Sequence, residues 1–335
     1  MNRMIRKFHQ IVLGAFVLAM VPSFALALDA DTPLNSWLMR VHNASKQRTY
    51  TGTFVVSSGS NLASAKIWHV CDGAQQVERV EPLTGVPRST YRRNDRVVTL
   101  YPRSKVAIIE TRDSLGLFPG LLKSTDVNIA DNYLFKDLGV ERMAGFDADG
   151  IGLTPKDTLR YGYRVWSEKR TGLVIQVQTL DANGRVIEQS AFSELQLDAP
   201  VKMAQLVEEM ENTKGYRVDR PSLRTVTPKS MGWGLTIPVA GFHQVGCYSR
   251  PSVRTQAKPE PASAMMQWIF TDGLATLSLF VEDFDLQSHP REGFIDTGGA
   301  TQILTRRVSD WWVTAVGEVP LTTLRAFVAA LERNK

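Results

Sequence analysis

The sequence predicts an α+β protein that is mostly antiparallel β and forms two domains. From Leu159 to Trp166, successive side chains fall into two alternating sets, as the two faces of a β-strand require. Asn183-Gly184 separates two further strand-like runs and indicates a hairpin, because both residues tolerate positive φ. The chain has 335 residues, more than one compact core usually holds, so a second domain is expected.

Residues 1–27 are predicted to be a cleavable signal peptide. A basic start precedes an apolar stretch from Ile11 to Val21, which is too short to span a bilayer comfortably. Ala25-Leu26-Ala27 offers the small residues that a signal peptidase needs, so we expect cleavage after Ala27; a retained anchor is the weaker alternative. Cleavage would leave 36 basic against 34 acidic residues, and no long Lys/Arg run points to nucleic acid.

The first domain is expected to span residues 28–202. Its first helix should begin at Thr32-Pro33, because apolar residues from Leu34 to Val41 recur at helical spacing. Six strands should follow, at Tyr50–Ser57, Ala65–Cys71, Gln75–Val80, Arg88–Arg93, Arg96–Tyr101 and Val106–Thr111. Asp113 to Asp131 interrupts this pattern and fits a short helix or an apolar loop; strands then resume from about Tyr133 to Leu197.

The second domain is expected to span residues 231–335, after a linker at 203–230. The linker assignment depends on its many charges and two prolines, and its start could be helical. Pro251 to Ala262 is predicted to be a mobile polar loop. Strands are expected at Met266–Phe270, Leu274–Val281, Thr301–Val308 and Trp311–Val316, before a closing helix whose apolar stripe includes Leu324, Phe327, Val328 and Leu331.

The two cysteines, Cys71 and Cys247, allow two interpretations. In an oxidising compartment they could form a disulfide that joins the two domains, or they could be two distant buried thiols; spacing alone does not decide. A nucleophilic role for Cys71 is not expected, because His69 is the only nearby base and no third residue would orient it.

No motif in the sequence predicts catalysis or metal binding. The histidines of the mature chain lack partners at metal-ligand spacing, and neither a nucleophile elbow nor a phosphate-binding loop is present. Asp147-Ala148-Asp149-Gly150 begins like a calcium loop, but Ile151 occupies the next ligand position. We therefore expect a protein that is not an enzyme, without metal or cofactor.

Several short pieces resemble one family, in the family's order. They are Tyr50-Thr51-Gly52-Thr53-Phe54-Val55, Ile67-Trp68-His69, Tyr161-Gly162-Tyr163, Thr171-Gly172-Leu173, Glu188-Gln189 with Phe192, Asp272-Gly273-Leu274-Ala275 with Ser278, Phe280 and Val281, and Val316-Gly317-Glu318-Val319-Pro320 with Thr323. Together they resemble the RseB/MucB family of periplasmic negative regulators of the sigma-E (AlgU-type) envelope stress response.

The resemblance implies a fold and a function. It implies a large N-terminal domain similar to the LolA/LolB lipoprotein carriers, a half-open β-barrel with helices on its concave side, and a smaller α/β C-terminal domain. It also implies a periplasmic protein that binds the periplasmic part of a RseA/MucA-like, membrane-anchored anti-sigma factor and shields it from regulated proteolysis. Lipopolysaccharide or the acyl chains of mislocalised lipoproteins would displace it.

Candidate site residues follow from this expectation. For an apolar cavity that takes acyl chains, with Leu117 to Leu122 as a movable lip, the candidates are Leu115, Leu117, Phe118, Leu121, Leu122, Trp68 and Tyr163. For the anti-sigma surface of the second domain, aromatic and basic residues are the candidates: Trp268, Phe280, Phe284, Arg306, Arg307, Trp311 and Trp312. For each set, ordinary packing in the core is the competing interpretation.

Two other functions compete with regulation. A carrier of lipoproteins or lipids for outer-membrane biogenesis would use the same half-barrel, but simple carriers have one domain. An enzyme acting on lipid or peptidoglycan would need a nucleophile and base, or a set of metal ligands, and the sequence supplies neither. The sequence also leaves open whether the protein forms a homodimer.

Overall fold

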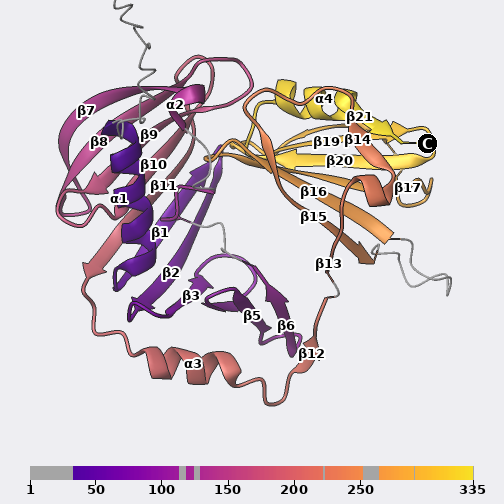
Figure 1. The fold of residues 1–335 in the computed structure, drawn as a ribbon. Coiled ribbons are helices and arrows are strands. Elements are labelled where there is room, and N and C mark those ends of the chain that lie inside the picture. The colour runs from indigo at the N-terminus through magenta and orange to yellow at the C-terminus, as the bar shows by residue number, and fades with distance from the viewer. Residues whose placement is uncertain are drawn as a thin grey trace, which may run out of the picture.

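The computed structural model describes residues 33–112, 118–123, 129–221, 223–251, 264–289 and 291–334. The predicted signal peptide, the cavity candidates Leu115 and Leu117, and most of the predicted loop Pro251–Ala262 lie outside the described residues. The described part forms a large curved sheet and a smaller sheet beside it (Figure 1). Within these ranges, no helix has both the length and the apolar character needed to cross a membrane.

In the described residues, the first domain is one large sheet of twelve strands. In chain order they are β1 (Tyr50–Ser58), β2 (Asn61–Cys71), β3 (Gln76–Pro82), β4 (Ser89–Arg93), β5 (Arg96–Tyr101), β6 (Val106–Thr111), β7 (Tyr133–Met143), β8 (Phe146–Pro155), β9 (Gly162–Glu168), β10 (Val174–Leu180), β11 (Val186–Leu197) and β12 (Arg217–Asp219). Their order across the sheet is β12-β6-β5-β4-β3-β2-β1-β11-β10-β9-β8-β7, so the described edges β12 and β7 do not pair and the barrel is half-open, as expected.

The concave side of this sheet packs on α1 (Pro33–Gln47), around which the strands curve (Figure 1). Leu34, Leu38 and Val41 are buried on the helix, at the spacing of one helical face, among core residues of β8, β9 and β10. A short helix, α2 (Ile129–Asn132), lies just before β7. The expected first helix is therefore confirmed, and it supplies the core that a curved sheet needs on its inner face.

The segment predicted to be a linker is bound to both sheets. Its helical start is α3 (Met203–Glu211), whose buried Leu206 and Met210 pack against the outer face of the large sheet. Glu209 of α3 forms an ion pair of 2.8 Å with Arg79. β12 then joins the large sheet in parallel with β6, and β13 (Arg224–Thr225) joins the small sheet beside β15 (His243–Pro251).

The second domain contains a seven-stranded sheet in the described residues, covered on one face by α4 (Leu321–Ala330). Its remaining strands are β15 (His243–Pro251), β16 (Ala264–Thr271), β17 (Thr276–Asp283), β18 (Gly293–Asp296), β19 (Gln302–Val308) and β20 (Trp311–Gly317), in the order β13-β15-β16-β17-β20-β19-β18. A 3-10 turn (Lys229–Met231) precedes β14 (Trp233–Leu235), which pairs with β21 (Leu331–Arg333). The fold class, α+β and mostly antiparallel with a smaller second domain, is confirmed.

The sequence did not predict the short strands β12, β13, β14, β18 and β21, nor the longer strand β15. Strand β15 pairs with β16 through a register shift between Gln244 and Gly246. Because a bulge puts one extra residue into a strand, the alternation of inward and outward side chains is interrupted there. The period-two pattern by which the other longer strands were predicted is therefore absent from this segment.

Of the two interpretations of the cysteines, the disulfide between Cys71 and Cys247 is wrong. Both residues are free thiols in the structure. Cys71 ends β2 in the large sheet, whereas Cys247 is buried in β15 within the core of the second domain. Burial raises the pKa of the Cys247 thiol to about 11, so this thiol stays protonated at neutral pH.

Candidate functional site

The two domains meet around one buried turn of the small sheet. The turn between β16 and β17 contains Asp272, which is fully buried. Its carboxylate accepts a hydrogen bond of 2.8 Å from the hydroxyl of Tyr133, in the first domain, and two more from the backbone of its own turn. The Arg160 guanidinium, also from the first domain, lies 3.7 Å from the same carboxylate and donates to the Ala240 carbonyl. A buried polar cluster thus joins the domains.

The next residues of this turn enter the core of the first domain. Leu274 is buried among residues that otherwise belong to the first domain. Beside it, the backbone N–H of Lys123 donates a 2.8 Å hydrogen bond to the Gly273 carbonyl. Residues 118–123, here called the lip segment, are therefore bound directly to the second domain. The second domain also approaches the first domain closely at Gly299. A Cβ at this position would collide with the side chain of Ser58, at the end of β1.

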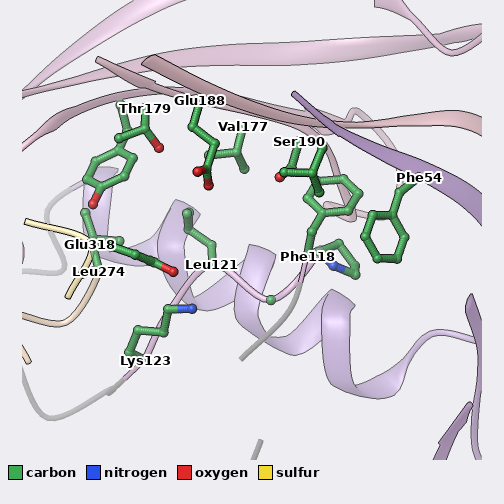
Figure 2. Close-up of a pocket in the computed structure, with 14 residues that line it drawn as sticks. Phe54, Phe118, Leu121, Lys123, Val177, Thr179, Glu188, Ser190, Leu274 and Glu318 are labelled. Carbon is green, nitrogen blue, oxygen red and sulfur yellow. The ribbon is translucent and has the colours of Figure 1, made fainter. Parts of the chain in front are cut away.

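A cavity of about 210 Å³ lies where the large sheet, the lip segment and the second domain meet (Figure 2). The sheet contributes residues of β1, β9, β10 and β11, and the second domain contributes Leu274 and Glu318. The lining residues are Phe54, Val56, Phe118, Pro119, Gly120, Leu121, Lys123, Tyr163, Val177, Thr179, Glu188, Ser190, Leu274 and Glu318. The cavity therefore belongs to both domains.

One end of the cavity is aromatic. Phe118 of the lip segment packs with its ring centroid 4.9 Å from that of Phe192 and 5.6 Å from that of Phe54. Figure 2 shows Phe118 and Phe54 on the same side of the cavity. Phe54 and Phe118 thereby line this end of the cavity with apolar aromatic surface, which suits an apolar ligand. Gly52 allows this cluster to form, because a Cβ at that position would lie 2.8 Å from the Phe192 ring.

The other end of the cavity is charged. Glu188 points from β11 towards Leu121, and Lys123 rises towards the cavity from the lip segment (Figure 2). Burial raises the pKa of the Glu188 carboxyl, and the negative charge of Glu318 raises it further, whereas Lys123 and a hydrogen bond from the Ala300 amide oppose the shift. The cavity is therefore amphipathic, with carboxylates contributed by both domains.

Glu188→Gln is expected to remove a pH-dependent loss of stability. Because its pKa is raised in the folded state, Glu188 holds its proton more tightly there than in the unfolded chain, so stability falls as pH rises through this interval. Above the folded-state pKa the variant should have the higher free energy of unfolding, and below about pH 4 the advantage should vanish. Urea denaturation at both pH values measures this, with exposed Glu194→Gln on the same strand as control. An equally higher free energy of unfolding for Glu188→Gln at both pH values would contradict the prediction.

The cavity candidates from the sequence divide into four groups. Phe118, Leu121 and Tyr163 line the cavity, and Leu122 packs in the adjacent core without lining it. Trp68 was placed wrongly, because alternation along β2 turns it to the outer face of the sheet. There it packs with residues of α3, under the guanidinium of Arg79 at 4.7 Å. Leu115 and Leu117 lie outside the described residues.

The seven anti-sigma candidates do not form one surface. Pairing in the small sheet puts Phe280, Arg307 and Trp312 on the face away from α4, with Phe284 beside them under the guanidinium of Arg307. Trp268 lies in the domain core on the α4 side. Trp311 packs edge-to-face on Trp233, and Arg306 is exposed. The Trp312 side chain is buried. Its ring stacks on that of His289 on the face away from α4, with the two ring centroids 4.8 Å apart.

Sequence analysis did not identify Phe54, Glu188, Leu274 or Glu318 as cavity residues. A signal was nevertheless present, because each lies within a different piece that resembles the family. Tyr163, which was predicted, lies within a fifth piece. Five separate pieces of the sequence therefore meet at one cavity, which suggests that these pieces form one site.

Among the described residues, no cluster of three His, Cys, Asp or Glu side chains could hold a metal ion. The fold and the site define a two-domain protein in which a half-open barrel and a small α/β domain enclose a shared amphipathic cavity. The chain belongs to the MucB/RseB family, since the MucB/RseB N-terminal domain matches residues 33–210 and the MucB/RseB C-terminal domain matches residues 227–332.

Two curated relatives cover most of the chain. The sigma factor AlgU regulatory protein MucB of Pseudomonas aeruginosa is 26% identical over 86% of this chain and 87% of its own length. The sigma-E factor regulatory protein RseB of Haemophilus influenzae is 22% identical over 83% of this chain and 84% of its own length. The solved complex of P. aeruginosa MucA and MucB has a chain with the same fold, with a TM-score of 0.68 and 24% identity over 91% of this chain and all of that one.

Proposed function

We propose that this protein is a periplasmic regulator that binds the periplasmic part of a MucA/RseA-type anti-sigma factor and shields it from regulated proteolysis. The observation that carries the proposal is the match of both domains to the MucB/RseB family, supported by the regulatory names of its relatives. MucB has been solved in complex with the periplasmic part of MucA, and that MucB chain has a similar fold, with a TM-score of 0.66. The predicted signal peptide fits a periplasmic location.

The cavity between the domains supports a second part of the proposal, which is that the protein senses lipid. Its aromatic end would take part of an acyl chain, and each buried methylene contributes roughly 0.8 kcal/mol to binding. The charged end, with Lys123 beside the carboxylates, would lie near the polar part of the ligand. Lipopolysaccharide and the acyl chains of mislocalised lipoproteins both have this amphipathic chemistry.

Ligand binding and partner binding would be coupled through the lip segment. The lip segment lines the cavity and also bonds to the turn of the second domain, so a ligand that displaces it would alter how the two domains sit together. A tenfold loss of partner affinity requires only about 1.4 kcal/mol of coupling, which two buried methylenes could supply.

A protease-protection assay tests the regulatory part. The purified periplasmic fragment of a MucA/RseA-type factor is incubated with its site-1 protease, with and without this protein. We expect slower cleavage at increasing concentrations of the protein, because bound fragment is inaccessible. Unchanged cleavage, together with no binding by calorimetry, would refute the proposed function.

A lipid or lipoprotein carrier is the second candidate, favoured by the open barrel with its cavity. The contribution of Leu274 and Glu318 to the cavity wall argues for regulation instead, because a carrier needs no second domain around its cargo. Transfer of lipid from the protein to a membrane receptor, without any anti-sigma binding, would support the carrier.

A further inference from the structure

A second and larger cavity, of about 650 Å³, lies between the large sheet and the small sheet. Three parts of the chain form its walls: the end of β6, the connection between β12 and β13, and the face of the small sheet that α4 does not cover. The lining residues are Ile109, Glu110, Thr111, Arg112, Pro221, Leu223, Thr225, Tyr248, Arg250, Gln267, Ile269 and Phe280. We call this cavity the linker groove.

Part of a sheet edge opens into the linker groove. β12 pairs with β6 only from Val106 to Ile108, and in the described residues no strand pairs with Ile109–Thr111 on that side. Arg112 donates its N–H to Asp95 on the β5 side, whereas Lys105 accepts a hydrogen bond from Arg217 on the β12 side. Since successive residues of a strand alternate in direction, the carbonyl of Ile109 and the backbone groups of Thr111, which lie beyond the last β12 residue, Asp219, face the groove. They offer hydrogen bonds to an extended chain.

The opposite wall carries an arginine without a carboxylate partner. Within the described ranges, Arg250 has no acidic side chain at ion-pair distance; its guanidinium donates to Gln267, and its Nε is buried without a hydrogen bond. Arg112 faces the same space, although it pairs with Glu110 at 2.9 Å. Burial lowers the pKa of Arg250 and the charge of Arg112 lowers it further, whereas the nearby Glu110 carboxylate, which is paired with Arg112, opposes the shift. A carboxylate here would balance the charge and satisfy the unpaired N–H.

Apolar side chains surround this arginine. Phe280 and Ile269 lie on the same face of the small sheet as Arg250, and Leu223 approaches from the connection. An extended segment presents every second side chain to one wall. The lining therefore fits an acidic residue with apolar neighbours two positions away. The backbone edge fits a polypeptide better than a lipid headgroup or free phosphate, neither of which can continue a sheet.

We propose that the linker groove binds an extended, acidic segment of the protein partner, which adds to β6 beyond β12 and places a carboxylate on Arg250. The inference rests on the proposed function for the identity of the partner. It assigns a role to Phe280, one of the seven surface candidates, which lines the linker groove. It also places the partner against the connection between them, where it would respond to a change in domain arrangement.

Calorimetric titration of the periplasmic fragment of a MucA/RseA-type factor tests the charge contact. Arg250→Gln should weaken binding at least tenfold, and Arg250→Lys should restore part of the affinity. Arg185→Gln, at an exposed hairpin tip of the first domain, is the matched control and should bind like the wild type. Thermal melting of each variant shows whether it is folded; Phe280→Ala replaces Arg250→Gln if that variant is not.

Hydrogen exchange tests strand addition. Amides in residues 106–112 should exchange more slowly in the complex of the wild-type protein. The inference stands only if this protection and the loss of affinity are both seen. Binding by the wild type with unchanged Arg250→Gln affinity, or without protection of this segment, would overturn it and leave the proposed function intact. Absence of binding to the wild type would overturn both.

Discussion

Replacing Asp272 by alanine is expected to lower the free energy of unfolding by about 3–5 kcal/mol, the cost of breaking a buried ion pair by removing one partner. Asp272 and the side chain of Arg160 are both fully buried, and the two residues come from different domains. The substitution would also remove the acceptor for the Tyr133 hydroxyl and for two backbone amides. The loss should therefore include separation of the domains.

Urea denaturation followed by tryptophan fluorescence measures the loss. Asp310→Ala is the control, because that carboxylate is 96% exposed and should contribute little. Asp272→Asn retains an acceptor for the turn and should fall between the wild type and Asp272→Ala. A loss below about 1 kcal/mol for Asp272→Ala would show that the polar cluster does not hold the domains together.

Ser190→Phe is expected to reduce lipid affinity at least tenfold while preserving partner binding. Ser190 lines the cavity on β11, so a phenyl ring there would fill space that the proposal assigns to an acyl chain. Excluding two methylenes costs about 1.6 kcal/mol of binding, which corresponds to slightly more than a tenfold change. Titration with lipopolysaccharide measures the affinity directly.

Ser193→Phe is the matched control for this variant. Ser193 lies on the same strand but is exposed and outside the cavity lining, so its substitution should leave lipid affinity unchanged. Equal lipid affinity for wild type and Ser190→Phe would place the lipid elsewhere. Equal losses for both serine variants would point to an effect on the strand rather than on the cavity.

The sequence predicted much of the fold, because alternation and helical spacing are local. The bounds of β5 and β6 agree with the predicted Arg96–Tyr101 and Val106–Thr111, and α1 begins at the predicted Pro33. Strand β15 was missed where a bulge interrupts the alternation. Local pattern thus predicted most of the longer strands, whereas short strands such as β18 (Gly293–Asp296) were also missed.

The site depended on information that local pattern does not contain. Alternation shows that Trp68 and Ile67 face opposite ways, but the curvature of the sheet decides which of them faces the inside; Trp68 lies outside. Cys71 and Cys247 illustrate the same limit, since strand order separates them. The cavity forms only when Leu274 and Glu318 of the second domain dock on the first. In the sequence, only the resemblance to the family connected Leu274 and Glu318 with the cavity residues of the first domain.

The most direct test of the account is calorimetric titration of the anti-sigma periplasmic fragment into this protein, with and without saturating lipopolysaccharide. If a cavity shared by the two domains links lipid binding to partner release, the fragment should bind at least tenfold more weakly when lipid is present. The same partner affinity in both titrations, with lipid binding confirmed separately, would contradict that linkage.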